Sequence, residues 1–305
     1  MTDAEIIRAF PRYEGSGEPG FFIDFLGTRT RTAYISTLPQ AGGVVEDYPA
    51  GDGNFHASTV EWAGALRAVL DACRGVPFVV VELGAGWGPW LVSLASAARA
   101  KGLDDVRLVG IEGSADHVAY MHTHFADNGI DPRRHRLVHA VVGTSDGVAE
   151  FPVHNEPSVR WGDAAIFTEP QPWTFRRVAR PVYHGLRRLL GRAPAAAPPR
   201  AATVRVPSLS IPTVLRDFAR VDLVHIDIQG HEYDVVASAR GVLRQKVHRL
   251  VIGTHGRDIE AQLRDELGAN GWTLEADEQC VYTDEANQLG LYRDGCQVWR
   301  NPAIA

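Results

Sequence analysis

The chain has 305 residues, of which 45% are hydrophobic and 22% are charged, as in a globular domain with an extension. Its formal net charge of −6 provides no general attraction to nucleic acid or to an anionic membrane, so neither is expected as a partner. Three widely spaced cysteines without a C-x-x-C pattern argue against a disulfide framework or a zinc site, and they favour a reducing, cytoplasmic setting. The polar start does not resemble a signal peptide, and no apolar run is long enough to span a bilayer.

Residues 1–56 precede the regular pattern of the chain and are expected to form an N-terminal extension or cap. Two apolar runs, 21–27 and 31–35, predict a small hairpin. Ser58 and Glu61 have the spacing of a capping box, which predicts the start of a helix. Glu61 is therefore expected to be the capping acid, with a ligand contact as the alternative.

From residue 57 to residue 305, expected strands and helices alternate, so this part is expected to be one domain. Strands are predicted at 78–83, 106–111, 136–142, 221–226, 250–254, 272–276 and 296–299. Helices are predicted at 89–101, from 115 to the Asn-Gly stop at 128–129, after Gly230, and up to the Asn-Gly stop at 270–271. The alternation predicts a mostly parallel sheet with helices on both faces.

Residues 171–205 stand apart as a basic, proline- and alanine-rich insert with eight arginines and no acid. Segments of this length without a clear pattern are either lids or poorly ordered loops. We interpret the insert as a mobile, solvated segment, with a lid over the substrate and a surface for an anionic partner or membrane as alternatives.

A glycine loop follows the first strand of the expected sheet. The strand ends at Glu82, the glycines follow with the spacing G-x-G-x-G, and a helix begins at about residue 89. A backbone without Cβ atoms allows a ligand to approach closely at this corner of an α/β sheet. The candidate cofactor-binding residues here are Glu82, Gly84, Ala85, Gly86, Trp87 and Gly88.

The residues around the loop indicate which kind of ligand it is expected to bind. No Lys or Arg lies between Arg74 and Arg99 to meet a phosphate, and an acid precedes the loop. The third glycine comes two residues after the second, whereas the dinucleotide fingerprint requires three. These features favour a cationic, phosphate-free adenosine compound, S-adenosylmethionine.

Further candidates follow the other expected strands, because the carboxyl ends of parallel strands meet at one edge of the sheet. Glu112 and Gly113 come after the second strand, where the carboxylate could hold a ribose. Asp227 ends the fourth strand and His255 the fifth. His56, just before the first helix, is a candidate to fold over the cofactor.

Three of these residues are candidates for the chemistry. His255 is the first candidate for a general base, and Asp227 and His231 come next. A divalent metal held by Asp227, Glu232 and a histidine is the alternative, although no ligand spacing demands one and none is expected. His225, inside the fourth strand, is interpreted as a core residue.

The ordered motifs resemble those of the FkbM-type S-adenosylmethionine-dependent methyltransferases over roughly residues 55–300. They are Glu82–Gly88, Val109–Glu112, Ala140–Gly147, Ser208-Leu209 and Val224–Glu232. The resemblance implies the Rossmann-like fold of class I methyltransferases, with seven strands of which the last is antiparallel. It also implies that Glu112 binds the ribose, that Ala140 and Val141 border the adenine, and that Asp227 lies near the methionine end.

The expected activity is O-methylation of a hydroxyl group on a natural product or sugar, with a small molecule as acceptor. N- or C-methylation, a nicotinamide-dependent dehydrogenase and a non-catalytic S-adenosylmethionine-binding protein are the alternatives. The sequence leaves the oligomeric state open, a homo-oligomer included.

Overall fold

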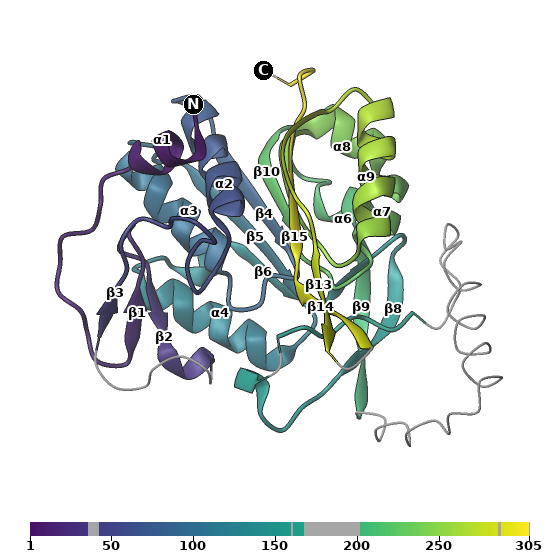
Figure 1. The fold of residues 1–305 in the computed structure, drawn as a ribbon, viewed down its shortest axis with the longest axis horizontal. Coiled ribbons are helices and arrows are strands. Elements are labelled where there is room, and N and C mark those ends of the chain that lie inside the picture. The colour runs from purple at the N-terminus through teal and green to yellow at the C-terminus, as the bar shows by residue number, and fades with distance from the viewer. Residues whose placement is uncertain (36–42, 160, 168–201, 286–287, 305) are drawn as a thin grey trace.

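The computed structural model describes residues 1–35, 43–159, 161–167, 202–285 and 288–304. A seven-stranded sheet forms its centre and carries helices on both faces (Figure 1). The strands lie in the order β12–β15–β11–β10–β4–β5–β6. Their bounds are β4 Phe78–Leu83, β5 Val106–Glu112, β6 Arg136–His139, β10 Val221–Ile226, β11 Val247–Thr254, β12 Thr273–Glu278 and β15 Gly295–Arg300.

The strand directions confirm the predicted sheet. Strands β6, β5, β4, β10 and β11 are parallel neighbours, whereas β15 runs antiparallel to both β11 and β12. The central strands β4 and β10 bury every residue, because helices cover both faces of the sheet. This is the Rossmann-like α/β architecture that the sequence predicts.

The helices form two layers with separate apolar cores. On one face, helices α2 Thr59–Asp71, α3 Pro89–Ala100 and α4 Ala115–Asp127 pack around Trp62, Leu91 and Phe125. On the other, α6 Ile211–Val214, α7 Glu232–Ser238, α8 Arg240–Lys246 and α9 Arg257–Ala269 pack around Val235, Leu243 and Leu263. The single helix predicted after Gly230 is thus two short helices that meet at Ala239.

The N-terminal extension contains α1 Asp3–Arg8, β1 Phe21–Ile23, β2 Arg29–Arg31, the 3-10 turn η1 Thr32–Tyr34 and β3 Val44–Val45. Strands β1 and β2 pair antiparallel, which confirms the hairpin. Most of the apolar run predicted as its second strand, 31–35, forms the turn η1 instead. Ile6, Phe10 and Phe25 are buried in the same core as α2 and α3. The extension therefore shares a core with the sheet.

Asp24 fastens this extension to the sheet domain. Its Oδ1 accepts the N–H groups of Leu26 (2.9 Å) and Thr28 (2.8 Å), and its Oδ2 accepts the hydroxyl of Ser93 on α3 (3.1 Å). The side chain is buried, and burial raises its pKa to about 6 despite these hydrogen bonds.

A second, three-stranded sheet has the order β7–β9–β8, with β7 Val141–Gly143, β8 Gly147–Pro152 and β9 Thr203–Ser210. The strand predicted over 136–142 is therefore divided at Ala140 between two sheets. Strand β9 and the hairpin of β13 Val281–Glu285 with β14 Gln288–Arg293 were not predicted. Two further 3-10 turns are η2 Pro132–Arg134 and η3 Pro157–Val159.

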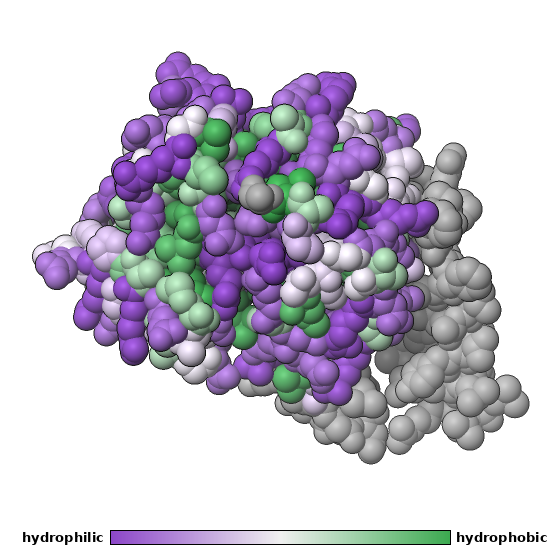
Figure 2. Space-filling view, turned by 90° about the horizontal axis from the view of Figure 1, so that it is seen from above, coloured by the Kyte–Doolittle hydropathy of each residue, from purple (hydrophilic) through white to green (hydrophobic). Residues whose placement is uncertain are grey.

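Most of the predicted insert at 171–205 lies outside the described residues. Its last residues, 203–205, begin β9. Among the described helices, none has both the length and the hydropathy that a membrane span requires. Seen from above the view of Figure 1, the surface is mainly hydrophilic, with hydrophobic residues in a narrow band and smaller patches (Figure 2).

Because burial raises the pKa of Asp24 from 3.8 to about 6, the folded chain binds more protons than the unfolded chain between these values. Stability contributed by this site is therefore present at pH 4 and is lost as the pH rises through 6. Between pH 4 and 7, we expect the free energy of unfolding of the wild type to fall by about 2–3 kcal/mol relative to that of Asp24→Asn. Urea unfolding of both proteins at each pH measures this.

Asp24→Ala is the matched comparison, since it removes the acceptor of two backbone N–H groups as well as the charge. It should lower the free energy of unfolding by about 1–3 kcal/mol at pH 4. Parallel pH profiles for the wild type and Asp24→Asn would contradict the assignment.

Candidate active site

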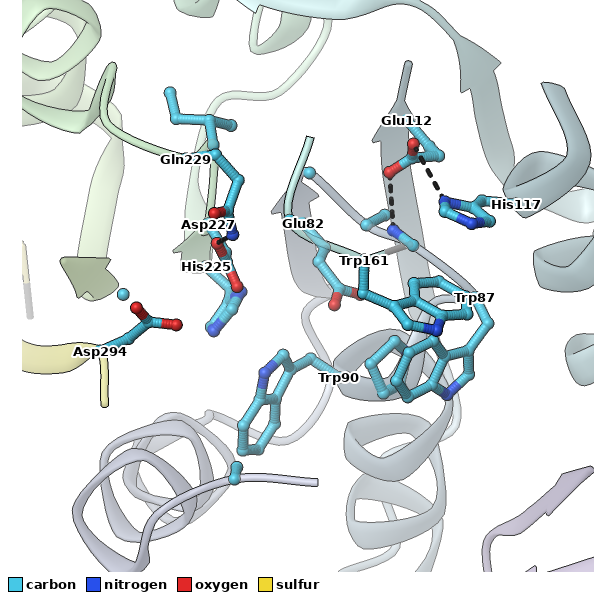
Figure 3. Close-up of a pocket in the computed structure, with 18 of the residues that line it drawn as sticks. Glu82, Trp87, Trp90, Glu112, His117, Trp161, His225, Asp227, Gln229 and Asp294 are labelled. Atoms are coloured by element: carbon cyan, nitrogen blue, oxygen red, sulfur yellow. Dashed lines mark hydrogen bonds and ion pairs between the residues drawn. The ribbon is translucent and has the colours of Figure 1, made fainter. Parts of the chain in front are cut away.

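A cavity of about 700 Å³ lies beyond the carboxyl ends of β4, β5 and β10, within the range of small-molecule sites. It is lined by residues from the glycine loop, the N-terminal extension and both sheets (Figure 3). The wall contains twelve of the residues predicted from the sequence. They are His56, Glu82, Gly84, Ala85, Gly86, Trp87, Glu112, Gly113, Ala140, Val141, Asp227 and His231.

The glycine loop has the left-handed backbone that its sequence predicts, with φ of 78° at Gly84 and 53° at Gly86. A Cβ at Gly84 would lie 1.8 Å from the carbonyl oxygen of Asp227, so only glycine fits there. Gly86 faces the cavity. Gly88 (φ 72°) is the N-cap of α3, lies against Met121, and is not part of the cavity wall.

Glu82, at the end of β4, is buried and bends towards the start of α3. Its Oε2 accepts the N–H of Leu91 at 3.2 Å. Burial, with the nearby charges of Asp227 and Glu61, raises the pKa of Glu82 well above its usual value even though backbone N–H groups stabilise its charge. The carboxylate thus caps a helix and lines the cavity at once.

Glu112 connects β5 to the glycine loop. Its Oε2 accepts the N–H of Gly86 (2.8 Å) and its Oε1 the N–H of Ser114 (2.7 Å). The ring of His117 lies beside the same carboxylate, with Nδ1 3.7 Å from Oε1 (Figure 3). The acid predicted to bind a ribose is therefore held by backbone groups at the cavity wall.

Aromatic rings form another part of the cavity wall. His56 packs between Trp62 and Trp90, with centroids 5.1 and 4.6 Å away, and burial lowers its pKa to about 3. Its imidazole is neutral at physiological pH. Trp87 lies 6.4 Å from the His56 ring, and its carbonyl oxygen accepts a hydrogen bond from His124 (3.0 Å).

The polar end of the cavity is organised around His255. Its Nδ1 lies 2.8 Å from Glu232, and its Nε2 lies 3.4 Å from Asp227 and 3.7 Å from Asp294. Burial by itself would lower the pKa of His255, but the hydrogen bond to Glu232 and the surrounding carboxylates outweigh it and raise the pKa to about 9. At neutral pH the ring therefore carries a proton on both nitrogens.

Of the carboxylates in this group, Asp227 and Asp294 line the cavity (Figure 3). The Asp227 side chain is 41% exposed towards the cavity, but the surrounding protein still desolvates it and raises its pKa to about 6, although the charges of His255 and His225 oppose the rise. Gln229 donates to its Oδ1 at 2.9 Å and adopts a left-handed backbone with φ of 54°. That conformation is uncommon outside glycine and fixes the turn after β10.

His231 is the N-cap of α7 and contacts a loop instead of Asp227. Its Nε2 donates to the carbonyl oxygen of Ala165 (3.1 Å), and its ring packs edge-on against Phe167. His255 itself is not part of the cavity wall and reaches the cavity through Asp227.

The structure revises the interpretation of Glu61 and His225, and it adds a residue that sequence reasoning missed, Asp294. Glu61 does not complete a capping box: Ser58 Oγ accepts its N–H (3.2 Å), but its carboxylate pairs with His225 (2.8 Å) at the cavity. His225 is buried, as predicted, but lines the cavity as well. Asp294 directly precedes the antiparallel strand β15. Because such a strand starts at the edge where parallel strands end, its position was a usable signal.

Within the described parts of the chain, no group of three or more His, Cys, Asp or Glu side chains is arranged as metal ligands.

Comparison with known proteins finds sequences similar to this chain. Residues 131–271 match the family described as "Methyltransferase FkbM domain". A protein of Jannaschia sp. (strain CCS1), described as "Putative methyltransferase", is 31% identical over 299 residues, which cover 98% of each chain.

Two solved structures align with most of this chain. One is a methyltransferase FkbM from Methylobacillus flagellatus KT (11% identity, TM-score 0.41, covering 79% of this chain and 54% of that one). The other is a precorrin-6Y C5,15-methyltransferase from Geobacter metallireducens GS-15 (12% identity, TM-score 0.41, covering 83% and 93%).

The proton on His255 can be tested directly. In the wild type, the imidazole signals of His255 in an NMR titration should change with a midpoint near pH 9. Glu232→Gln removes the hydrogen-bonded charge, so burial should dominate and move the midpoint down by at least about one unit. Asp265→Asn, an exposed change on α9, should leave it in place. A wild-type midpoint near 6.5 would contradict the assignment.

Proposed function

Because the chain belongs to the FkbM methyltransferase family, we propose that it transfers the methyl group of S-adenosylmethionine to a hydroxyl group of a small natural product or sugar. The charge of the cavity is the observation that carries this proposal. Seven acids line it, namely Asp52, Glu61, Glu82, Glu112, Asp163, Asp227 and Asp294. Arg293 is the one Lys or Arg among the described lining residues, and it is paired with Asp52 (2.8 Å) and Glu278 (3.4 Å).

Such a cavity fits a cation. Carboxylates that are partly removed from water are unfavourable without compensation, as the raised pKa values of Glu82, Asp227 and Asp294 indicate. A sulfonium and an α-ammonium group would supply the missing positive charge. A pyrophosphate would add negative charge to this wall, which disfavours a nicotinamide cofactor.

Each part of the wall has a role in the proposal. Glu112 would accept the ribose hydroxyls, and Gly113, Ala140 and Val141 would border the adenine. Glu82 would face the ammonium group, and Gly86 would give the ligand access to the backbone. S-adenosylmethionine, when bound, supplies an electrophilic methyl group on a positively charged sulfur.

The acceptor hydroxyl must lose its proton, and we propose that Asp227 is the general base that accepts it. A general base is most effective when its pKa lies near the working pH, and that of Asp227 is about 6. His255 already bears a proton at neutral pH, so in this proposal it holds the carboxylate instead of acting as the base. The cavity would contribute the alignment of the reacting groups.

The proposal predicts pH-dependent binding. A cation binds ionised Asp227 better than protonated Asp227, so affinity for S-adenosylmethionine should rise between pH 5 and 7 and level off above. Calorimetry near pH 6 should show proton release on binding, and Asp227→Asn should reduce both effects. Uncharged 5′-methylthioadenosine is the matched ligand, whose affinity should change little. A chain that bound NADH and not S-adenosylmethionine would refute the proposal.

Asp227→Asn should also lower kcat by about 10²–10⁴, the usual contribution of a general base. Transfer of labelled methyl groups to a panel of hydroxyl, amine and activated-carbon acceptors measures this and separates O- from N- and C-methylation. Asp265→Asn serves as the control. Unchanged turnover in Asp227→Asn would exclude the assigned base, and ligand binding without transfer to any acceptor would favour a non-catalytic role.

A further inference from the structure

A loop that the sequence did not single out crosses the carboxyl edge of the sheet. It comprises residues 153–159 and 161–167, which follow β8, and we refer to it as the strap. The carbonyl oxygen of Pro157 accepts a hydrogen bond from His117 on α4 (3.1 Å), and that of Ala165 accepts one from His231 at the start of α7 (3.1 Å). The strap is thus fixed on both sides of the cavity.

Contacts within the strap and with β8 define its shape. His154 pairs with Asp163 (2.6 Å), and the indole N–H of Trp161 donates to the carbonyl oxygen of Ser158 (3.2 Å). Ile166 exchanges two backbone hydrogen bonds with Glu150 of β8 (2.9 and 2.8 Å). The shape of the strap is therefore held by contacts within the strap and with β8.

Trp161 lies where the strap meets the glycine loop (Figure 3). Its ring stacks on His117, with centroids 4.0 Å apart and an interplanar angle of 12°, and meets Trp87 at 4.6 Å and 81°. A Cβ at Gly86 would be 3.3 Å from the Trp161 ring. Glu112, which accepts the N–H of Gly86, lies beside His117, the ring on which Trp161 stacks.

The chemistry of this ring limits what it can recognise. Its N–H is already bonded inside the strap, so it offers the cavity an aromatic surface and no hydrogen bond. An aromatic surface beside a glycine backbone and a ribose-binding acid suits a nucleoside, since indole rings bind bases and sugars through stacking and apolar contact.

We propose that Trp161 is a ligand-binding residue that forms a wall of the nucleoside subsite, and that the strap positions it there. This inference rests on the proposed function, because S-adenosylmethionine supplies the nucleoside. It also gives His231 and His117 a positioning role, since both anchor the strap by hydrogen bonds to its carbonyl oxygens.

The test compares Trp161→Ala, Trp161→Phe and the control Val159→Ala, which changes an exposed strap residue. Calorimetry measures binding of S-adenosylhomocysteine and of 5′-methylthioadenosine, which share the nucleoside but not the amino-acid part. Trp161→Ala should weaken both by a similar factor of about five to fifty, as expected for one lost stacking contact. Trp161→Phe should retain most of the affinity, and Val159→Ala all of it.

Ligand-induced change in tryptophan fluorescence provides a second readout, because it should be much smaller in Trp161→Phe than in the wild type even where affinity is retained. Thermal melts establish whether each variant is folded. If Trp161→Ala does not fold, the fluorescence and affinity of Trp161→Phe still test the inference. Unchanged or tighter binding by folded Trp161→Ala would overturn the inference, because the ring would then be irrelevant to the ligand or would obstruct it. A wild-type chain that bound neither compound would instead contradict the proposed function itself.

Discussion

The desolvation of carboxylates at one edge of the sheet is the constraint on which the site depends. Parallel strands bring Glu82, Glu112 and Asp227 to the same edge, where burial opposes their charge. The chain compensates Glu82 and Glu112 with backbone N–H groups from the next loop or helix, and it compensates Asp227 with an imidazolium. In the proposed function, the remaining negative charge gives the cavity its preference for a cationic ligand.

Local patterns were sufficient to predict much of this arrangement. Every strand of the central sheet and the glycine loop could be predicted, because a buried strand followed by glycines has few alternative folds. The placement of Glu112 at the cavity followed from the same rule. Strand β9 could not be predicted, since its first three residues belong to the arginine-rich stretch and are all exposed, without the alternation of a strand.

The missed site residues depend on tertiary contacts. Glu61 has the sequence context of a capping acid, and only the position of α2 over β10 brings it to His225. Trp161 belongs to a loop without regular structure. His255 shows a different limit: its position could be predicted, but its proton could not, because Glu232, Asp227 and Asp294 come from separate parts of the chain.

The contact between Gly84 and Asp227 has a consequence for how this site can evolve. The carbonyl oxygen of Asp227 occupies the space that a side chain at Gly84 would need, and the Asp227 N–H donates to Leu83 (2.9 Å). The two loops are thus interlocked through main-chain atoms, whatever side chain position 227 carries. Evolution can therefore exchange the side chain at position 227 while the main chain of the neighbouring glycine loop keeps its shape.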